Sequence, residues 1–259
     1  MRDLRVTVVQ SMLHWEDAAA NRVMFGEKLA PLAGKTDLIV LPEMFTTGFS
    51  MQSAKLAEAM DGPTVAWMRE QAQRLGAVLY GSAIIQDEGN YFNRGLFVRP
   101  DGAVQHYDKR HLFRMADETA HYTVGSRRVI VELHGWRLLL QVCYDLRFPV
   151  FARNRGDYDA ILYAACWPEV RRYPWSQLLI ARAIENQAYV IGVNRVGMDG
   201  EGHHYAGDSV VLDPKGMPLL QLTAAQEEVG TTTLDQAAQA EFRAKFPAHL
   251  DADTFDLRL

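Results

Sequence analysis

Cysteine is scarce in this chain, and several features that mark particular protein classes are missing. Only two cysteines occur among the 259 residues, Cys143 and Cys166, which is too few for a disulfide framework. Basic residues are not in excess, because 27 Lys and Arg stand against 32 Asp and Glu, for a formal net charge of −5. Nucleic-acid-binding domains usually carry a concentrated basic surface, so the composition argues against a nucleic-acid partner.

Long apolar runs are also absent. The longest, near Val78–Ile85 and Arg137–Tyr144, are far shorter than the ~20 residues that a membrane-spanning helix needs. The N-terminal segment MRDLRVTVVQ alternates charged and apolar residues, whereas a signal peptide needs a continuous apolar region. We therefore expect no membrane partner and a cytoplasmic location, where thiols stay reduced and available for chemistry.

Strand-like apolar segments alternate with amphipathic helical segments, and no Gly/Ser-rich linker divides the chain. The expected strands are Leu4–Gln10, Asp37–Leu41, Val78–Ile85, Leu96–Arg99, Val104–Tyr107, Val129–Leu133, Arg137–Val142, Ala160–Ala165, Tyr189–Asn194, Ser209–Leu212 and Leu219–Leu222. The expected helices are Asp17–Leu32, Pro63–Leu75, Pro149–Arg155 and Trp175–Gln187. This order predicts one α/β domain over residues 1–259, with mixed sheets because hairpin turns join several neighbouring strands. The last segment, Gln236–Leu259, is either a closing helix with a tail or an arm that packs on a partner subunit.

Three reactive side chains stand where apolar strands end, the position at which α/β folds tend to expose functional groups. Glu43 follows the strand that ends at Leu41, and Lys109 follows the second strand of an expected hairpin. Cys143 comes directly after a strand and shortly before an expected helix, which is the arrangement of a nucleophile elbow. The pattern suggests a general base, a cation that stabilises an oxyanion, and a nucleophile.

Each of these residues also has a purely structural interpretation when it is taken alone. Glu43 could be a surface glutamate just beyond a strand, and Lys109 could belong to a solvated run of charges. Cys143 could be a small buried apolar side chain, as free cysteine often is. The local sequence leaves both interpretations open for all three.

Taken together, these segments resemble the nitrilase (carbon–nitrogen hydrolase) superfamily, which is marked by Glu, Lys and Cys in this order. The matching phrases are LPEMF around Glu43, YDKRHLF around Lys109 and CYDLRFP from Cys143. The resemblance continues through Trp167-Pro168 and through ARAIENQAYV, Gly207-Asp208-Ser209 and the DPKG turn. It therefore covers almost the whole chain.

The resemblance implies a four-layer α-β-β-α sandwich and a homodimer in which two sandwiches pack through helices. The segment Trp175–Gln187, with Arg182 and Glu185, resembles part of that interface. It also implies an amidase that works through a cysteine thioester, with no metal or organic cofactor.

In the mechanism that these residue types support, Glu43 takes the thiol proton and later donates it to the leaving ammonia. Cys143 forms a thioester with the acyl group, and Glu43 then activates water to release the acid. Lys109 and the backbone N–H of Tyr144 hold the oxyanion.

The family has a second glutamate on the loop after the lysine. Glu118 matches it, because it stands seven residues before Gly125. In this role Glu118 would orient Lys109 or the substrate amide, and the alternative is an exposed loop glutamate.

Within the superfamily, DKRHLFRMADE and CYDLRFPV most resemble bacterial ω-amidases, which hydrolyse the terminal amide of 2-oxoglutaramate or 2-oxosuccinamate. A bidentate arginine suits the carboxylate of such a substrate. Arg147 matches the family's arginine in that role, and an ion pair with Asp145 is the alternative. Arg171 and Arg172 are further candidates, although they could equally form a solvated pair of charges. The aromatic residues that could form apolar pocket walls, or simply belong to the core, are Phe45, Tyr144 and Trp167.

Cys166 departs from the pattern of close relatives, where asparagine is expected, and this leaves the exact substrate open. Rival functions are an amidase for N-carbamoyl or aliphatic amides, a catalytically silent binding protein, and a redox protein that uses both cysteines. The redox reading lacks a C-x-x-C motif.

Histidine-based sites compete poorly with these readings. A papain-like pairing of the cysteine with His111 or His134 lacks the matching local context. His203 and His204 are adjacent, so they point in different directions on a strand, and no second cluster of metal ligands accompanies them.

Overall fold

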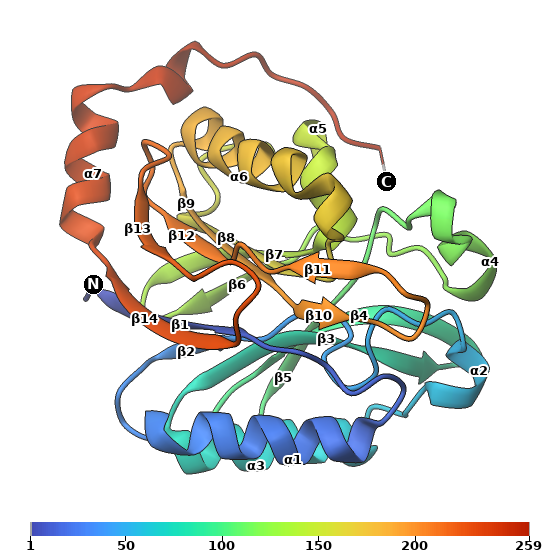
Figure 1. The fold of residues 1–259 in the computed structure, drawn as a ribbon. Helices are drawn as coiled ribbons and strands as arrows, with labels where there is room; N and C mark the ends of the chain where they lie inside the picture. The colour runs from blue at the N-terminus through green and yellow to red at the C-terminus, as the bar shows by residue number, and fades with distance from the viewer. Residues whose placement is uncertain (1, 259) are drawn as a thin grey trace.

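Two six-stranded mixed sheets form the centre of the molecule in the computed structural model, which describes residues 2–258 (Figure 1). The first sheet has the order β14-β1-β2-β3-β4-β5 and consists of β1 (Leu4–Gln10), β2 (Leu38–Val40), β3 (Val78–Asp87), β4 (Asn90–Val98), β5 (Val104–Asp108) and β14 (Glu228–Leu234). The second has the order β13-β12-β9-β8-β7-β6 and consists of β6 (Ile130–Leu133), β7 (Trp136–Val142), β8 (Ala160–Ala165), β9 (Tyr189–Asn194), β12 (Val210–Leu212) and β13 (Pro218–Gln221). A separate hairpin is formed by β10 (Val196–Met198) and β11 (His204–Ala206).

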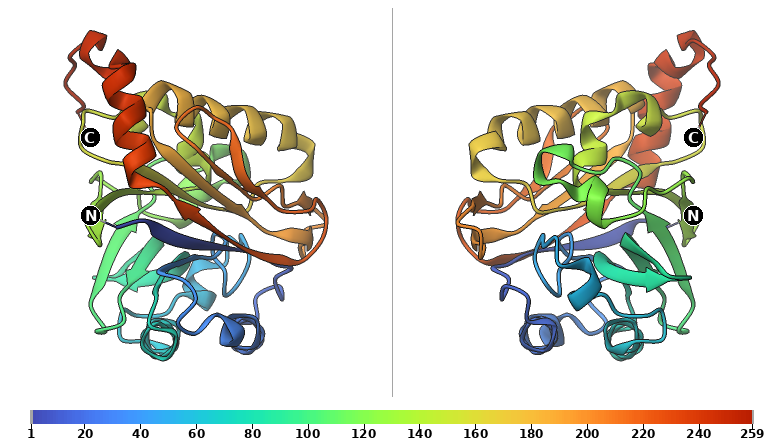
Figure 2. Two further views of the ribbon diagram at one scale, coloured as in Figure 1. Left: turned by 90° about the vertical axis from the view of Figure 1, so that its left-hand side faces the viewer. Right: turned by 90° about the vertical axis from the view of Figure 1, so that its right-hand side faces the viewer.

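Helices cover the outer face of each sheet, so the molecule has four layers (Figures 1 and 2). Helices α1 (Ala18–Leu29) and α3 (Pro63–Leu75) lie on the first sheet, and α5 (Pro149–Ala152) and α6 (Arg172–Asn186) lie on the second. The remaining helices are α2 (Ser53–Leu56), α4 (Glu118–His121), α7 (Gln236–Lys245) and the 3₁₀ helices η1 (Ala30–Leu32), η2 (Arg114–Ala116), η3 (Cys143–Arg147), η4 (Glu169–Arg171) and η5 (Ala248–Asp251). The expected α-β-β-α sandwich is confirmed. Within residues 2–258, no helix is both long enough and apolar enough to cross a bilayer.

The sheets pack through a shared core because their strands carry apolar residues on both faces. Val6 and Val8 of β1 belong to the same buried cluster as Leu138 of β7 in the other sheet. Val9 points to the opposite face and belongs to the cluster beneath the outer helices, together with Phe25 of α1. The alternation along one strand therefore builds two of the contacts between layers.

Every expected strand and helix is present, and most of their ends lie within two residues of the expected ones. Strands β1, β8 and β9 and helix α3 match residue for residue. Helix α1 begins after Asp17, whose carboxylate accepts a hydrogen bond from Ala20 N at 2.9 Å, as an N-cap should. The prediction is wrong by three or more residues at four ends. Strand β4 begins at Asn90 instead of Leu96, α1 ends at Leu29 instead of Leu32, α5 ends at Ala152 instead of Arg155, and α6 begins at Arg172 instead of Trp175.

The C-terminal part of the chain returns to both sheets. Strand β14, which the sequence analysis does not predict, pairs antiparallel with β1 and places Leu234 opposite Leu4. Helix α7 follows, and the buried side chain of Gln239 donates to the Asp159 carbonyl at 2.8 Å. The expected closing helix therefore packs on its own second sheet.

The carboxyl ends of parallel strands from both sheets meet at one edge. Strands β1, β2 and β3 are parallel neighbours in the first sheet, and β7, β8 and β9 are parallel neighbours in the second. Glu43 follows β2, Cys143 follows β7 and Cys166 follows β8. The topology thus gathers residues that lie far apart in the sequence.

Candidate active site

Three charged side chains from separate segments form one buried cluster. Lys109 Nζ lies 2.9 Å from Glu43 Oε1 and 2.9 Å from each carboxylate oxygen of Glu118. None of the three residues is more than 1% exposed. One ammonium between two carboxylates needs further hydrogen-bond donors in such a setting, and the neighbouring segments provide them.

The chain turns sharply after β2 to present Glu43. Met44 N donates to Ser82 Oγ at 2.8 Å, and Met44 has a φ of 42°, in the left-handed region that residues other than glycine seldom adopt. Cys166 N donates to Glu43 Oε2 at 2.9 Å. One oxygen of the Glu43 carboxylate therefore faces Lys109, and the other accepts a backbone N–H from the second sheet.

The loop after β5 closes back on Lys109. Gly125 N donates to Lys109 O at 3.0 Å. A Cβ at Gly125 would stand 1.9 Å from the Asp108 carbonyl oxygen, so only glycine fits there. Within the loop, Phe113 N donates to Glu118 Oε2 at 2.5 Å. The same carboxylate therefore binds Lys109 and fixes the loop that passes over it.

Cys143 stands at a strained turn where β7 passes into η3. Its φ is 44°, and such a conformation costs roughly 1–3 kcal/mol for a residue other than glycine. The residue is 7% exposed, and it lines a pocket together with Lys109. This geometry matches the strand–turn–helix arrangement expected from the sequence.

Burial and charge determine the protonation states of the cluster. Burial raises the pKa of the Cys143 thiol well above its ordinary value, and the charge of Glu43 raises it further against the opposing charge of Lys109. Burial would lower the pKa of Lys109, but the charges of Glu118 and Glu43 outweigh it and raise that pKa well above its ordinary value. Burial also raises the pKa of Glu118, although Lys109 opposes this. The resting thiol is therefore protonated beside a permanent cation, and a base must remove its proton before it can attack.

Replacing Glu43 with glutamine is expected to lower the pKa of the Cys143 thiol. The change removes the negative charge and the hydrogen bond that disfavour the thiolate, while Glu118 still pairs with Lys109. The pH midpoint for alkylation of Cys143 by iodoacetamide should therefore fall, with peptide mass spectrometry separating Cys143 from Cys166. The exposed Glu88→Gln variant serves as the control, and an unchanged or higher midpoint in Glu43→Gln would contradict this electrostatic account.

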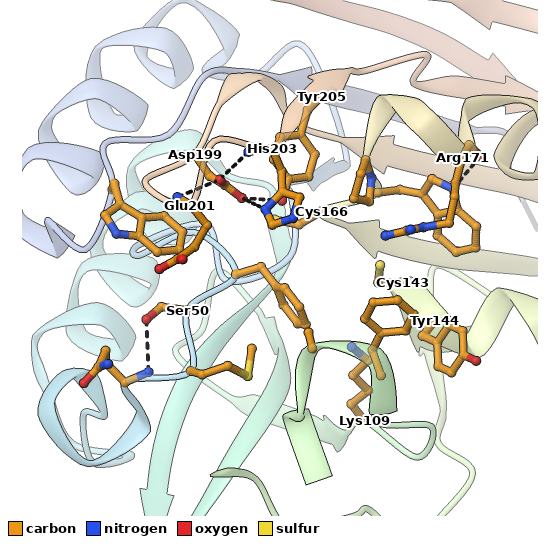
Figure 3. A pocket seen from close by; sticks show the side chains of 18 of the residues that line it. Ser50, Lys109, Cys143, Tyr144, Cys166, Arg171, Asp199, Glu201, His203 and Tyr205 are labelled. Carbon is orange, nitrogen blue, oxygen red and sulfur yellow. Dashed lines mark hydrogen bonds and ion pairs between the residues drawn. The ribbon is translucent and has the colours of Figure 1, made fainter. Parts of the chain in front are cut away.

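A pocket of about 360 Å³ opens beside the cluster (Figure 3). Cys143, Tyr144 and Arg171 lie on one side of it. The hairpin β10–β11 supplies the other side through its turn and its second strand, with Asp199, Glu201, His203 and Tyr205. The pocket thus has a cationic wall near the thiol and an acidic wall opposite.

Two arginines line this pocket without an ion-pair partner among residues 2–258. The guanidinium carbon of Arg147 lies 4.9 Å from the centre of the Trp167 ring, and that of Arg171 lies 5.2 Å from the Phe113 ring. Arg147 does not pair with Asp145, whose carboxylate accepts hydrogen bonds from other groups. Both guanidiniums therefore keep donors available for an anion in the pocket.

Two of the residues expected at the substrate lie elsewhere, and those predictions are wrong. Phe45 is fully buried, and its ring packs 5.6 Å from that of Phe25 and 5.8 Å from that of Trp67. Arg172 begins α6 and binds the Asp208 carboxylate with hydrogen bonds of 3.0 and 2.7 Å. The predicted substrate residues that do line the pocket are Tyr144, Arg147, Trp167 and Arg171.

Asn93 of β4 also belongs to the buried cluster, although it is not among the residues predicted from the sequence. Its Nδ2 donates to Glu43 Oε1 at 2.8 Å and to Glu118 Oε1 at 3.2 Å. Its backbone oxygen accepts a hydrogen bond from Lys109 N at 3.0 Å. A polar amide side chain inside a strand could have indicated this role. The predicted strand begins only at Leu96, however, so Asn93 fell outside it.

Cys166 lies against the segment that carries Glu43. Its thiol donates to the Glu43 carbonyl oxygen at 3.2 Å, and the residue lines the pocket. Burial raises the pKa of this thiol, and the charge of Glu43 adds to the effect. A neutral thiol, which is a weak donor, therefore occupies the position where asparagine is expected.

The adjacent histidines do not gather further ligands. His203 lines the pocket and its Nδ1 lies 3.5 Å from the Asp199 carboxylate, whereas His204 lies in β11. Across the part of the chain that the structure describes, no group of three or more His, Cys, Asp or Glu side chains is arranged to hold a metal ion.

A fold of this kind with a buried Glu-Lys-Glu cluster beside a cysteine defines a class, and the chain belongs to the carbon–nitrogen hydrolase family. The family description "Carbon-nitrogen hydrolase" matches residues 5–244. The chain is 52% identical over 257 residues to Omega-amidase YafV of Escherichia coli strain K12, covering 99% of this chain and 100% of that protein. It is 31% identical over 220 residues to the 2-oxoglutaramate amidase of Bacillus subtilis strain 168, covering 83% of this chain and 84% of that protein. The crystal structure of XC1258 from Xanthomonas campestris, a CN-hydrolase superfamily protein, has 54% identity and a TM-score of 0.97, covering 99% of this chain and 100% of that one.

Proposed function

We propose that this chain is an ω-amidase that hydrolyses the terminal amide of 2-oxoglutaramate and 2-oxosuccinamate to the 2-oxo dicarboxylate and ammonia. The observation that carries the proposal is the guanidinium of Arg147, which has no ion-pair partner within residues 2–258 and lines the same pocket as Cys143. A short substrate with an amide at one end and a carboxylate at the other can contact both residues at once. The relatives named omega-amidase and 2-oxoglutaramate amidase support this substrate class.

The first half of the reaction forms a thioester. Glu43 removes the thiol proton as the sulfur of Cys143 attacks the amide carbon, and the carbonyl electrons move to the oxygen. Lys109 and the backbone N–H of Tyr144 stabilise that oxyanion. When the tetrahedral intermediate collapses, the C–N bond breaks and Glu43 gives its proton to the nitrogen, which leaves as ammonia.

The second half of the reaction releases the acid. Glu43, again ionised, removes a proton from water, and the resulting hydroxide attacks the thioester carbon. Lys109 and the Tyr144 N–H hold the second oxyanion, and the C–S bond breaks as Glu43 returns the proton it took from water to the Cys143 sulfur. Glu118 keeps Lys109 charged and in place throughout, since both of its oxygens lie 2.9 Å from the ammonium.

The substrate carboxylate lies on the cationic side of the pocket. Arg147 binds it, and Arg171 is a second contact whose backbone carbonyl is fixed by Trp167 Nε1 at 2.7 Å. The rings of Trp167 and Tyr144 cover the apolar methylene carbons between the two ends of the substrate.

Ammonia release from 2-oxoglutaramate by the purified protein tests this assignment. Rapid release supports it, and no release from a folded protein contradicts it. A panel of N-carbamoyl amines and aliphatic amides run in parallel separates the ω-amidase from the other amidases of the family. A protein that forms no thioester with any of these compounds would instead be a binding protein.

Replacing Arg147 with glutamine is expected to raise KM for 2-oxoglutaramate by about 10- to 100-fold, since hydrogen bonds to a charged group are worth about 1.5–3 kcal/mol. The matched control is Arg172→Gln, because Arg172 pairs with Asp208 outside the pocket. KM should change little in the control. An amide without a carboxylate should be insensitive to both changes, and equal effects of the two variants on 2-oxoglutaramate would contradict the role of Arg147.

We also propose that two copies pair through α6 and work in the cytoplasm, where Cys143 stays reduced. Val170, Tyr173 and Ile184 are 84%, 73% and 53% exposed and supply apolar surface on or beside this helix. Arg182, in contrast, is buried in its own subunit, and its Nη2 donates to the Leu146 carbonyl at 2.6 Å. Light scattering that finds only monomers at micromolar concentration would contradict the pairing.

A further inference from the structure

Residues two positions from each reactive group are joined by hydrogen bonds. Asp145 lies two residues after Cys143, His111 lies two residues after Lys109, and Tyr107 lies two residues before it. The Asp145 carboxylate accepts a hydrogen bond from His111 Nδ1 at 2.7 Å and from the Tyr107 hydroxyl at 2.8 Å. The segment that carries Lys109 is therefore tied, on both sides of the lysine, to the turn that carries Cys143.

Asp145 is fully buried, and its hydrogen-bonding capacity is filled. Besides the two side chains, its carboxylate accepts from His111 N at 3.0 Å and from Val142 N at 2.9 Å. A carboxylate has about four acceptor sites, and four donors occupy them here. The other three donors are two backbone N–H groups and the Tyr107 hydroxyl, and we assign His111 Nδ1 as the fourth.

Aromatic packing fixes the ring of His111 as well. It stacks on Phe148 with 3.8 Å between ring centres and 7° between ring planes, and Phe151 meets its edge at 5.1 Å. Phe148 directly follows η3, and its N–H donates to the Asp145 carbonyl at 3.0 Å. His111 therefore holds both Asp145 and the residue just beyond the turn of Cys143.

None of these side chains belongs to the pocket lining that the structure describes, whereas Lys109 and Cys143 do. We propose that His111 and Asp145 are positioning residues, which set the placement of the Lys109 ammonium relative to the Cys143 sulfur. This role rests on the cysteine mechanism proposed above, in which Lys109 stabilises the oxyanion and Cys143 is the nucleophile. His111 and Asp145 keep these two groups aligned. A displacement of about 1 Å in such an alignment can cost about 100-fold in rate.

Two substitutions at His111 separate the hydrogen bond from the volume of the ring. His111→Asn keeps an N–H donor close to the position of Nδ1, and His111→Leu keeps an apolar side chain without a donor. The control is His106→Leu on β5, since His106 contacts Arg127 and not the cluster. Urea unfolding of all variants identifies any that lose stability.

We expect His111→Leu to lower kcat for 2-oxoglutaramate by about 100-fold with KM within about threefold, as a misaligned reacting group would. His111→Asn should recover at least about tenfold of that loss, and His106→Leu should match the wild type. A kcat for His111→Leu near that of the wild type would overturn the proposal. So would two folded His111 variants that are equally impaired.

A second readout does not depend on the substrate. Lys109 favours the thiolate of Cys143, so displacement of the ammonium should slow alkylation of Cys143 by iodoacetamide at a given pH. The rate should fall in His111→Leu and return toward that of the wild type in His111→Asn. If 2-oxoglutaramate is not hydrolysed at all, the ω-amidase assignment fails, but this order of alkylation rates still tests the positioning pair. Equal rates in all variants would overturn it.

Discussion

Replacing Cys143 with alanine is expected to lower kcat for 2-oxoglutaramate by about 10⁵-fold or more, the scale on which removal of a nucleophile disables other covalent hydrolases. Cys143 lines the pocket together with Lys109, and the charges of Glu43 and Lys109 both act on its thiol. Ammonia release measured with concentrated variant protein gives the residual rate. Mass spectrometry after rapid quenching should find no acyl-enzyme in Cys143→Ala. A variant that lacks only a substrate contact would still form it.

Cys166→Ala is the matched control, because Cys166 is a second buried thiol in the same pocket. Its link to the Glu43 carboxylate is made by its backbone N–H, which alanine retains. The control should therefore keep activity of the same order as the wild type. Residual activity above about 1% in Cys143→Ala, or equal loss in both variants, contradicts the assignment of Cys143, since a nucleophile's loss is far larger.

Replacing Lys109 with methionine is expected to lower the free energy of unfolding by about 3–5 kcal/mol at pH 8, because it leaves two buried carboxylates without their cation. The raised pKa of Lys109 means that its ammonium contributes fully at neutral pH and is lost only as the pH rises through that raised value. The same change should lower kcat by about 10²–10³-fold through loss of an oxyanion donor. Urea unfolding and ammonia release measure the two effects.

The pH dependence of the Lys109→Met variant follows from Glu118. Burial already raises the pKa of this carboxyl, so the folded state takes up a proton at a higher pH than the unfolded chain does. The free energy of unfolding of the variant therefore rises as the pH falls through the raised pKa of Glu118. The difference in this free energy between the wild type and Lys109→Met should shrink from pH 8 toward pH 5. The double variant with Glu118→Gln should be more stable than Lys109→Met alone. Additive losses would show that the carboxylates do not repel each other as the geometry indicates.

The elements that carry the reactive residues were predictable from local sequence. Apolar runs such as Ala160–Ala165 define strands whose ends fix where Glu43, Cys143 and Cys166 can lie. The phrases around Glu43, Lys109 and Cys143 then indicate that these ends belong to one site. Asn93 could not be found in the same way, because the predicted strand stops short of it and its role depends on two carboxylates from other segments.

The arginines show why individual contacts were harder to predict. Arg171 and Arg172 are neighbours in sequence, but adjacent residues at the start of a helix point in different directions. Arg171 lines the pocket, and Arg172 binds Asp208. The ring of Phe45 packs inward against Phe25, directly after the left-handed backbone of Met44, which no local sequence pattern predicts.

The hairpin β10–β11 and strand β14 were missed for a different reason. Both are short or polar, so their own sequences carry little of the apolar periodicity that marks buried strands. The hairpin nevertheless brings Asp199 and His203 to the pocket. Its placement depends on packing against Trp15, since a Cβ at Gly200 would stand 2.3 Å from that ring.

The pairing of β1 with β14 can form only late in the synthesis of the chain. Glu228 pairs with Gln10 but is synthesised 218 residues later, as the difference of their numbers shows. At roughly 5–20 residues per second, this interval is on the order of 10–45 s. During that time one edge of an apolar strand stays open on the ribosome, which makes it a natural site for chaperone protection or for aggregation. Strand β14 therefore covers an edge of β1 that stays unpaired until translation has passed residue 228.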